Sequence, residues 1–192
     1  KGPLFGPFSL YSEVFAQLDD DEYSDTTVQD HENRRNRRPK VSFDEMYILL
    51  PIGSLDIRAG FQTIAWGTGD LQNPTDNMNP RDISDLFDGK KIGVLALRLN
   101  YYLADFDFEG IVIPFFTPTR IPPAGKRFSP AIQPIAIPVG NAVVVPNLVI
   151  DRQFPDDDDA IQFGGRVSRS IGGFDFSASY YDGFNKVPLT RV

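Results

Sequence analysis

The stretch Ser54-Leu55-Asp56-Ile57-Arg58-Ala59-Gly60-Phe61-Gln62-Thr63-Ile64-Ala65-Trp66 decides the fold class of this chain. From Leu55 to Phe61 every second residue is apolar, and polar or small residues such as Asp56 and Gln62 stand between them. A period of two is typical of a β-strand whose two faces meet different surroundings. The stretch is also longer than the five or six residues usual in globular strands, and about ten residues are needed to cross a bilayer at a tilt.

The same alternation recurs along the chain, whereas helical periodicity is nearly absent. We therefore predict an all-β fold with about seven long strands. The six further predicted strands span Phe8–Leu18, Val41–Leu50, Lys91–Ala104, Phe106–Phe116, Ala160–Ile171 and Phe174–Asp182.

The connections between these strands are alternately long and short. Short turns are expected at Pro51–Gly53, Ala104–Asp105 and Gly172–Gly173, and long loops at residues 19–40, 67–90 and 117–159. Outer-membrane barrels have tight turns at one end and long loops at the other. We therefore predict that residues 1–192 form a segment of one antiparallel up-and-down transmembrane β-barrel.

The predicted apolar face carries aromatic residues close to the short turns. They are Tyr101, Phe106, Phe108, Phe174 and Phe176. Their position is typical of the aromatic girdle at a membrane surface, although a sandwich core is the alternative. Bacterial barrels use an even number of strands, at least eight. Seven strands thus predict a partial barrel, completed by strands from elsewhere or by a second copy.

Composition excludes several function classes. The chain has 192 residues, a net charge of −7, no cysteine and one histidine, His31. Net acidity argues against nucleic-acid binding, and the missing cysteines rule out thiolate metal sites and thiol catalysis. The acidic runs at residues 19–22 and 156–159 lack the spaced ligands of a calcium loop. We expect no enzyme activity, no metal and no cofactor.

The polar face of the predicted strands would line the lumen. Rings or ladders of charge set the selectivity of pores, while cross-strand pairing within the wall is the alternative role for the same side chains. The predicted pore-lining residues are Arg58, Gln62, Arg98, Asn100, Glu109, Arg166 and Asp175.

The loop at residues 67–90 is the most distinctive connection. Asn79 is expected to cap a short helix that has Pro80 in its first turn and ends at Gly89. Such a helix could constrict the barrel, and a packed surface loop is the alternative. The predicted constriction residues are Trp66, Asp70, Asp76, Asn79, Arg81 and Asp82.

Short motifs in this region resemble porin-like outer-membrane β-barrel proteins of Gram-negative bacteria. They are Trp66-Gly67, Asp70 and Asn79-Pro80-Arg81-Asp82, with Gln162–Arg166 and Ser177–Gly183 similar to a later strand pair. The resemblance covers roughly Leu55 to Pro188. It implies a barrel that passes small solutes passively or selectively, with no catalytic residue.

We therefore expect a porin-like channel for small hydrophilic solutes in the bacterial outer membrane. Its expected partners are the lipid bilayer, lipopolysaccharide and small solutes, and the basic run at residues 34–38 is either a lipopolysaccharide contact or a disordered segment. One alternative is a soluble all-β ligand-binding module, a sandwich or lipocalin-like barrel with its apolar faces inward. Another is an adhesive or structural surface barrel.

Overall fold

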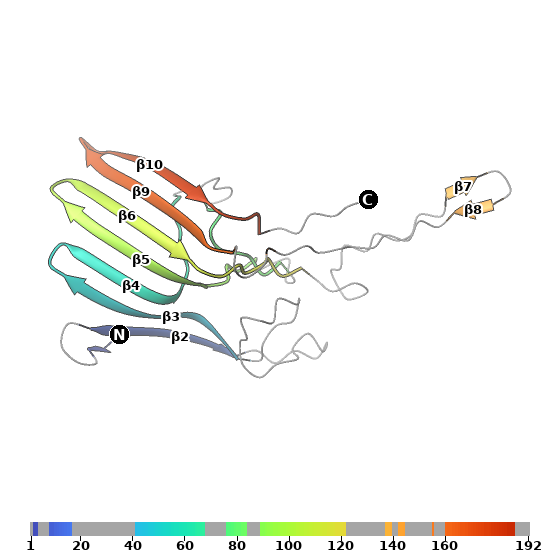
Figure 1. Cartoon of the computed structure of the whole chain (residues 1–192), viewed down its shortest axis with the longest axis horizontal. Coiled ribbons are helices and arrows are strands. Elements are labelled where there is room, and N and C mark those ends of the chain that lie inside the picture. Colours follow the sequence, from blue (N-terminus) through green and yellow to red (C-terminus); the bar gives the residue numbers. More distant parts are fainter. Residues whose placement is uncertain are drawn as a thin grey trace.

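A computed structural model describes residues 2–3, 8–16, 41–67, 76–83, 89–121, 137–139, 142–144, 155 and 160–186. Within this part of the chain the regular structure is entirely β (Figure 1). The strands are β1 (Gly2–Pro3), β2 (Ser9–Ala16), β3 (Val41–Ile52), β4 (Leu55–Gln62), β5 (Val94–Leu103), β6 (Phe106–Ile113), β7 (Ile137–Val139), β8 (Ala142–Val144), β9 (Gln162–Ile171) and β10 (Phe174–Asp182).

The seven long strands form one antiparallel, up-and-down sheet. Its order is β1-β2-β3-β4-β5-β6-β9-β10, so each long strand pairs with its neighbours in the chain apart from the insertion of β7 and β8. The sheet is open, with β10 at one edge and the two-residue β1 at the other. β7 and β8 form a separate hairpin and, among the described strands, contact only each other. The predicted all-β fold and its seven long strands are confirmed.

The short connections lie close to where the sequence placed them. β3 continues through Pro51 and Ile52, so the first turn is Gly53–Ser54 and not Pro51–Gly53. The other two short turns lie at Ala104–Asp105 and Gly172–Gly173, as predicted. Both residues of the last turn have positive φ, +59° and +86°, which suits the tight turns that join twisted strands.

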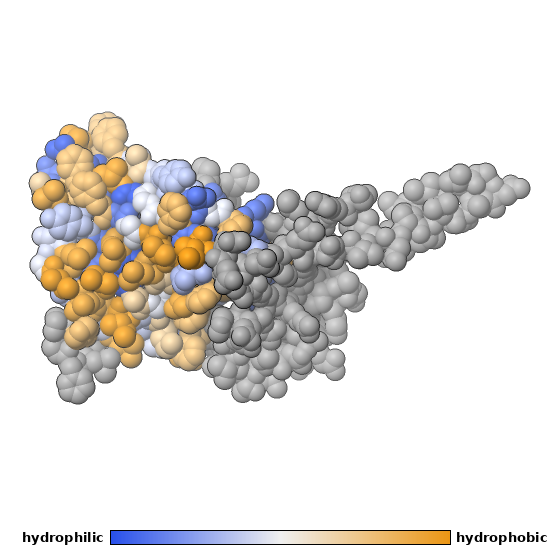
Figure 2. Space-filling view, viewed as in Figure 1, coloured by the Kyte–Doolittle hydropathy of each residue, from blue (hydrophilic) through white to orange (hydrophobic). Residues whose placement is uncertain are grey.

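Apolar side chains gather on one side of the sheet, here called the outer face (Figure 2). The register puts Leu55 opposite Tyr101 and Ile57 opposite Leu99, so apolar positions of neighbouring strands share this face. These side chains remain exposed, with Leu97 at 41% and Phe176 at 59%. The exposed apolar residues of this face include Leu10, Ile48, Ile52, Leu97, Leu99, Tyr101, Leu103, Phe106, Phe108, Val112, Phe163, Ile171, Phe174, Phe176 and Tyr180.

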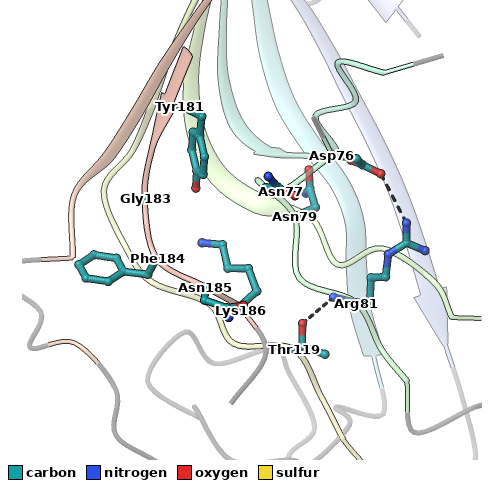
Figure 3. A pocket seen from close by; sticks show the side chains of 10 residues that line it. All are labelled: Asp76, Asn77, Asn79, Arg81, Thr119, Tyr181, Gly183, Phe184, Asn185 and Lys186. Carbon is teal, nitrogen blue, oxygen red and sulfur yellow. Dashed lines mark hydrogen bonds and ion pairs between the residues drawn. The ribbon is translucent and has the colours of Figure 1, made fainter. Parts of the chain in front are cut away.

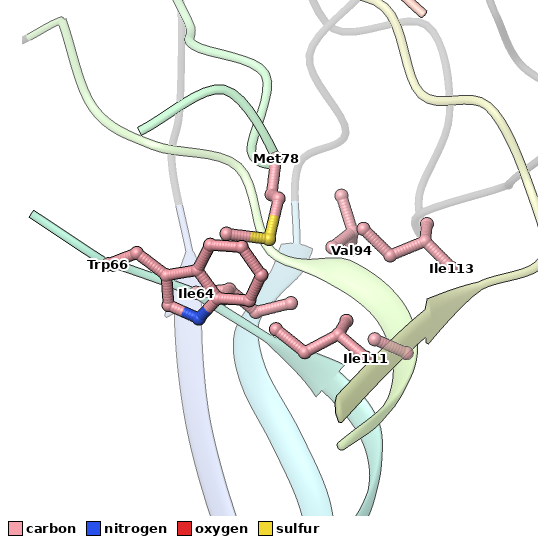
Figure 4. Packing of buried hydrophobic residues seen from close by; sticks show 7 residues of the cluster. Ile64, Trp66, Met78, Val94, Ile111 and Ile113 are labelled. Atoms are coloured by element: carbon pink, nitrogen blue, oxygen red, sulfur yellow. The ribbon is translucent and has the colours of Figure 1, made fainter. Parts of the chain in front are cut away.

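The opposite side, the inner face, has a dry end and a polar end. Near the long connections, an end here called the mouth, the buried apolar cluster consists of Ile64, Trp66, Met78, Val94, Ala96, Ile111 and Ile113 (Figure 4). Toward the short turns, one row of cross-strand partners runs through Asp56, Asn100, Glu109, Arg166 and Ser179.

β4 ends earlier than its alternation predicted. The pattern continues to Trp66, but the strand stops at Gln62, so residues 63–67 lie outside the strand. Their backbone groups find other acceptors: Thr63 N–H donates to Glu45 Oε1 at 3.0 Å, and Ile64 N–H donates to Asn79 Oδ1 at 2.7 Å. Side chains therefore replace the strand ladder here, as buried N–H groups require.

The fold predicts that a methyl group at Gly60 will destabilise the protein. Gly60 has φ +136°, and a Cβ there would lie 2.3 Å from Met46 O on β3. We expect Gly60→Ala to lower the free energy of unfolding by about 2–4 kcal/mol, measured by denaturant unfolding in detergent. The control is Gly110→Ala, because a Cβ at Gly110 meets nothing within 4 Å. Equal stability of the two variants would contradict the predicted clash at Gly60.

Candidate functional site

The predicted pore-lining residues all lie on the inner face, but they are not equally open to water. Arg58, Asn100 and Arg166 are partly exposed. Gln62 is different: it is fully buried, and its Nε2 donates to Ala96 O at 2.9 Å. The expectation that Gln62 faces water is therefore wrong, because the apolar cluster covers that end of the face.

The centre of the inner face holds an ion pair between neighbouring strands. Arg98 Nε on β5 lies 2.6 Å from Glu109 Oε1 on β6, and both side chains are largely buried, at 18% and 9% exposure. Glu109 also stands opposite Asn100 on one side and Arg166 on the other. This pair supports the alternative role of these side chains, which is to stabilise the wall by pairing across neighbouring strands. Because the pair is largely buried, salt screens its attraction only a little.

Two further arginines enrich this region in positive charge. Arg58 lies directly opposite Arg98 in the β4–β5 register, and its guanidinium stacks 4.7 Å from the centre of the Tyr47 ring. Within the described residues, neither Arg58 nor Arg166 forms an ion pair, and the Nε atom of each is buried without a hydrogen-bond partner. Arginines placed side by side repel one another and attract anions.

Residues 76–83, here called the mouth segment, fold against the dry end of the inner face. Met78 is fully buried in the apolar cluster beside Trp66 (Figure 4). Asn79, 5% exposed, accepts a hydrogen bond from Ile64 N–H at 2.7 Å. Its Nδ2 donates to Gln62 O at 3.3 Å and to Ile92 O at 2.9 Å. The Asn79 amide thus ties together three stretches of backbone.

Backbone hydrogen bonds also tie the mouth segment to both sides of the mouth. On one side, Ile92 N–H donates to Pro80 O at 2.8 Å. On the other side, Arg120 N–H donates to Arg81 O at 2.9 Å. The neighbouring Thr119 N–H donates to Lys186 O at 2.9 Å, which joins this strand-like stretch to the residues after β10. Arg81 therefore forms a β-bridge with Lys91, and Asp82 forms one with Arg120, so neither residue lies in a first helical turn. The predicted helix start at Asn79 is wrong, because the Asn79 side chain bonds to other segments.

Ion pairs surround the mouth segment. Asp76, with a side chain 7% exposed, pairs with Lys91 at 2.5 Å and Arg81 at 3.5 Å. Asp82 pairs with Arg120 at 3.4 Å. The structure thus brings Trp66, Asp76, Asn79, Arg81 and Asp82 together at the mouth, while their role in a constriction stays a prediction. Asp70, the sixth residue of that set, lies outside the described residues, as do His31, both acidic runs and the basic run at residues 34–38.

A cavity of about 460 Å³ opens between the mouth segment and the end of β10 (Figure 3). Lys186 is 6% exposed, and its Nζ donates to Gln162 Oε1. Tyr181 donates its hydroxyl proton to the same oxygen at 2.8 Å. Burial lowers the pKa of the Lys186 ammonium to about 8. The lining residues are Asp76, Asn77, Asn79, Arg81, Thr119, Tyr181, Gly183, Phe184, Asn185 and Lys186.

Little in the sequence around Lys186 and Met78 predicts this cavity. Lys186 follows the last strand in a polar context, Asn185-Lys186-Val187, where a solvated lysine is the usual expectation. Met78 likewise stands between two asparagines, a setting typical of an exposed turn. Both residues are buried by contacts with segments distant in the chain.

Comparison with known proteins identifies the family. Residues 10–191 match the family described as "Protein of unknown function (DUF1302)". The chain belongs to the DUF1302 family. The matched range of this DUF1302 chain takes in the inner face, the mouth segment and the cavity beside Lys186. No curated protein and no solved structure matches it.

Two features are absent from the described part of this DUF1302 chain. No group of three or more His, Cys, Asp or Glu side chains there is placed to hold a metal ion. In the same residues, no helix is long and apolar enough to cross a membrane.

Asn79→Ala should loosen the mouth segment. The change leaves the Ile64 N–H and two carbonyl oxygens without their partner, and each unsatisfied buried group costs about 1–3 kcal/mol. We expect the Ile64 amide to exchange its hydrogen about tenfold faster or more, measured by hydrogen–deuterium exchange in detergent.

Asn79→Asp separates hydrogen bonding from volume. The carboxylate keeps an acceptor for Ile64 N–H but places negative charge beside Gln62 O and Ile92 O. It should therefore loosen the segment at least as much as alanine. Unchanged exchange at Ile64 in both variants would show that Asn79 does not hold the segment.

Proposed function

We propose that this DUF1302 protein is a porin-like channel of the bacterial outer membrane that passes small hydrophilic solutes. The observation that carries the proposal is the inverted sheet: apolar side chains are exposed on the outer face, and charged side chains line much of the inner face. In lipid, that arrangement places apolar residues against acyl chains and polar residues in a lumen.

The extent of the outer apolar face supports this proposal. Soluble monomers rarely expose contiguous apolar patches beyond a few hundred Å². Here exposed large apolar residues lie on six of the seven long strands, from Leu10 on β2 to Phe176 on β10, and on β4 the outer-face residues Leu55 and Ile57 are partly exposed. Exposing each large apolar side chain to water forgoes about 1.5–3 kcal/mol, whereas a bilayer removes that cost.

Strand length and aromatic placement are consistent with the same proposal. The long strands have 8 to 12 residues, near the ~9–11 that a tilted strand needs to span a bilayer. Tyr101, Phe106, Phe108, Phe174 and Phe176 are all exposed on the outer face close to short turns. This is the position of an interfacial aromatic girdle.

The soluble alternative fits these observations less well. A lipocalin-like barrel or a sandwich would turn its apolar face inward and leave Arg98 and Glu109 outside. Instead, Leu97 and Phe176 are exposed on the outer face, while the Arg98–Glu109 pair is mostly buried on the inner face. An adhesive barrel fits the same outer face, so conductance must distinguish it from a channel.

The edges of the open sheet require partners in a membrane. β10 pairs only with β9 in the described structure, so backbone groups of its free edge would face lipid. Such groups cost several kcal/mol each when they lack partners in a bilayer. The proposed channel is therefore closed by further strands, from the same protein or from a second copy.

Reconstitution of the full-length protein tests the channel. We expect it to require detergent for extraction and to conduct ions in a planar bilayer. Arg58→Gln should raise the cation-to-anion permeability ratio about twofold, because it removes a positive charge from the inner face.

The matched control for this charge change is Arg169→Gln. Arg169 lies on the outer face near a short turn, where it pairs with Asp105 at 3.1 Å, so the selectivity should not change. A monodisperse protein that needs no detergent, or a folded membrane protein without conductance, would overturn the proposal.

A further inference from the structure

The cavity between the mouth segment and β10 presents a buried cation. Figure 3 shows the Lys186 ammonium and the Tyr181 hydroxyl on one side of the space, with Asn77 and Asn79 on the other. The volume of about 460 Å³ is within the ~300–1,000 Å³ range of small-molecule sites. The cavity is therefore large enough for a small organic solute.

The polar groups behind Lys186 are held in place. Gln162 is fully buried, and its Nε2 lies 3.4 Å from both Phe115 O and Ala160 O. This orientation aims Gln162 Oε1 at Lys186 Nζ and at the Tyr181 hydroxyl. The ring of Phe116 lies 5.0 Å from the same ammonium. Lys186 is thus fixed by its surroundings and points in a defined direction.

The ammonium lacks a counterion within the described residues. It has three N–H donors, of which one is accounted for by Gln162, and no carboxylate there pairs with it. Asp76 lines the same cavity, but Lys91 and Arg81 already pair with its Oδ2. A buried charge without a counterion is costly, and an anionic ligand would relieve that cost.

We propose that this cavity binds the carboxylate of a small organic anion, with Lys186 as its counterion. The body of the solute packs against Tyr181 and Phe184, and the latter is supported edge-to-face by Phe116 at 5.9 Å. One ammonium matches a monoanion, and the Asp76 carboxylate in the same lining disfavours a dianion such as a phosphate monoester. The inference deepens the proposed function, since it names the class of solute for that channel.

Benzoate is the probe that tests the site. Its affinity for the full chain in detergent is measured by isothermal titration calorimetry, with benzamide as the neutral analogue of the same shape. We expect benzoate to bind and benzamide to bind at least about tenfold more weakly, because only benzoate pairs with the ammonium. Equal affinities for the two compounds would overturn the proposal.

Lys186→Gln tests the residue itself. It should weaken benzoate binding about tenfold or more, whereas Arg169→Gln, which removes the same charge at the opposite end of the sheet, should leave it unchanged. Unaltered affinity in Lys186→Gln would contradict the assignment.

The pH dependence of benzoate affinity in the wild-type protein tests the same residue, even if the Lys186 variant does not fold. The other titratable groups around the cavity are Tyr181 on β10 and Asp76 and Arg81 on the mouth segment. Since the pKa of Lys186 is about 8, the protonated fraction falls about tenfold between pH 7 and pH 9, and benzoate affinity should fall with it. A flat profile over that range would count against Lys186.

These measurements remain distinct from the test of the channel. Binding in detergent needs no bilayer and no conductance. Benzoate binding by a protein that does not conduct would overturn the proposed channel but leave the binding site. Conductance without benzoate binding would overturn the binding site but leave the channel.

Discussion

The pairing register of the seven long strands, which shifts only between Glu13 and Val14 in the β2–β3 ladder, is the constraint on which the rest of the structure depends. Because side chains alternate with a period of two, a shift of one residue at any ladder would move a whole strand's apolar set to the other face. The pairing of Leu55 with Tyr101 keeps the apolar side chains of β4 and β5 on the outer face. The pairing of Asp56 with Asn100 keeps their polar side chains on the inner face. The outer apolar face, the inner charges and the mouth all follow from that alignment.

The inner face is divided along the strand direction, and the division gives the molecule its proposed selectivity. At its centre the Arg98–Glu109 pair and the neighbouring arginines present fixed charge. At the mouth, Met78 and Asn79 hold a segment of backbone against the sheet. A solute on the proposed path would meet the cavity beside Lys186 and the arginines in different places, so binding and selectivity can be altered separately.

Most of the sheet could be predicted from the sequence, but most details of the mouth could not. Alternation and turn residues are local signals, and they predicted the seven strands, two of the three short turns at the observed residues and the third within two residues. Contacts between distant segments determine the rest. They end β4 at Gln62, form the bridge between Arg81 and Lys91, and bury Lys186. For the same reason Asn79, which has the local signature of a helix cap, instead joins its own segment to residues 62–64 and to Ile92.

Labelling two adjacent residues of β5 tests the inverted sheet most directly. These 192 residues contain no cysteine, so Leu99→Cys and Asn100→Cys each add one labelling site to the full-length protein, and the unsubstituted protein reconstituted in lipid is the labelling control. The account predicts that a fluorophore at residue 99, on the outer face, is quenched by a lipid-borne quencher, while one at residue 100 is quenched by a water-soluble one. The reverse pattern, or equal quenching by water at both positions, would contradict it.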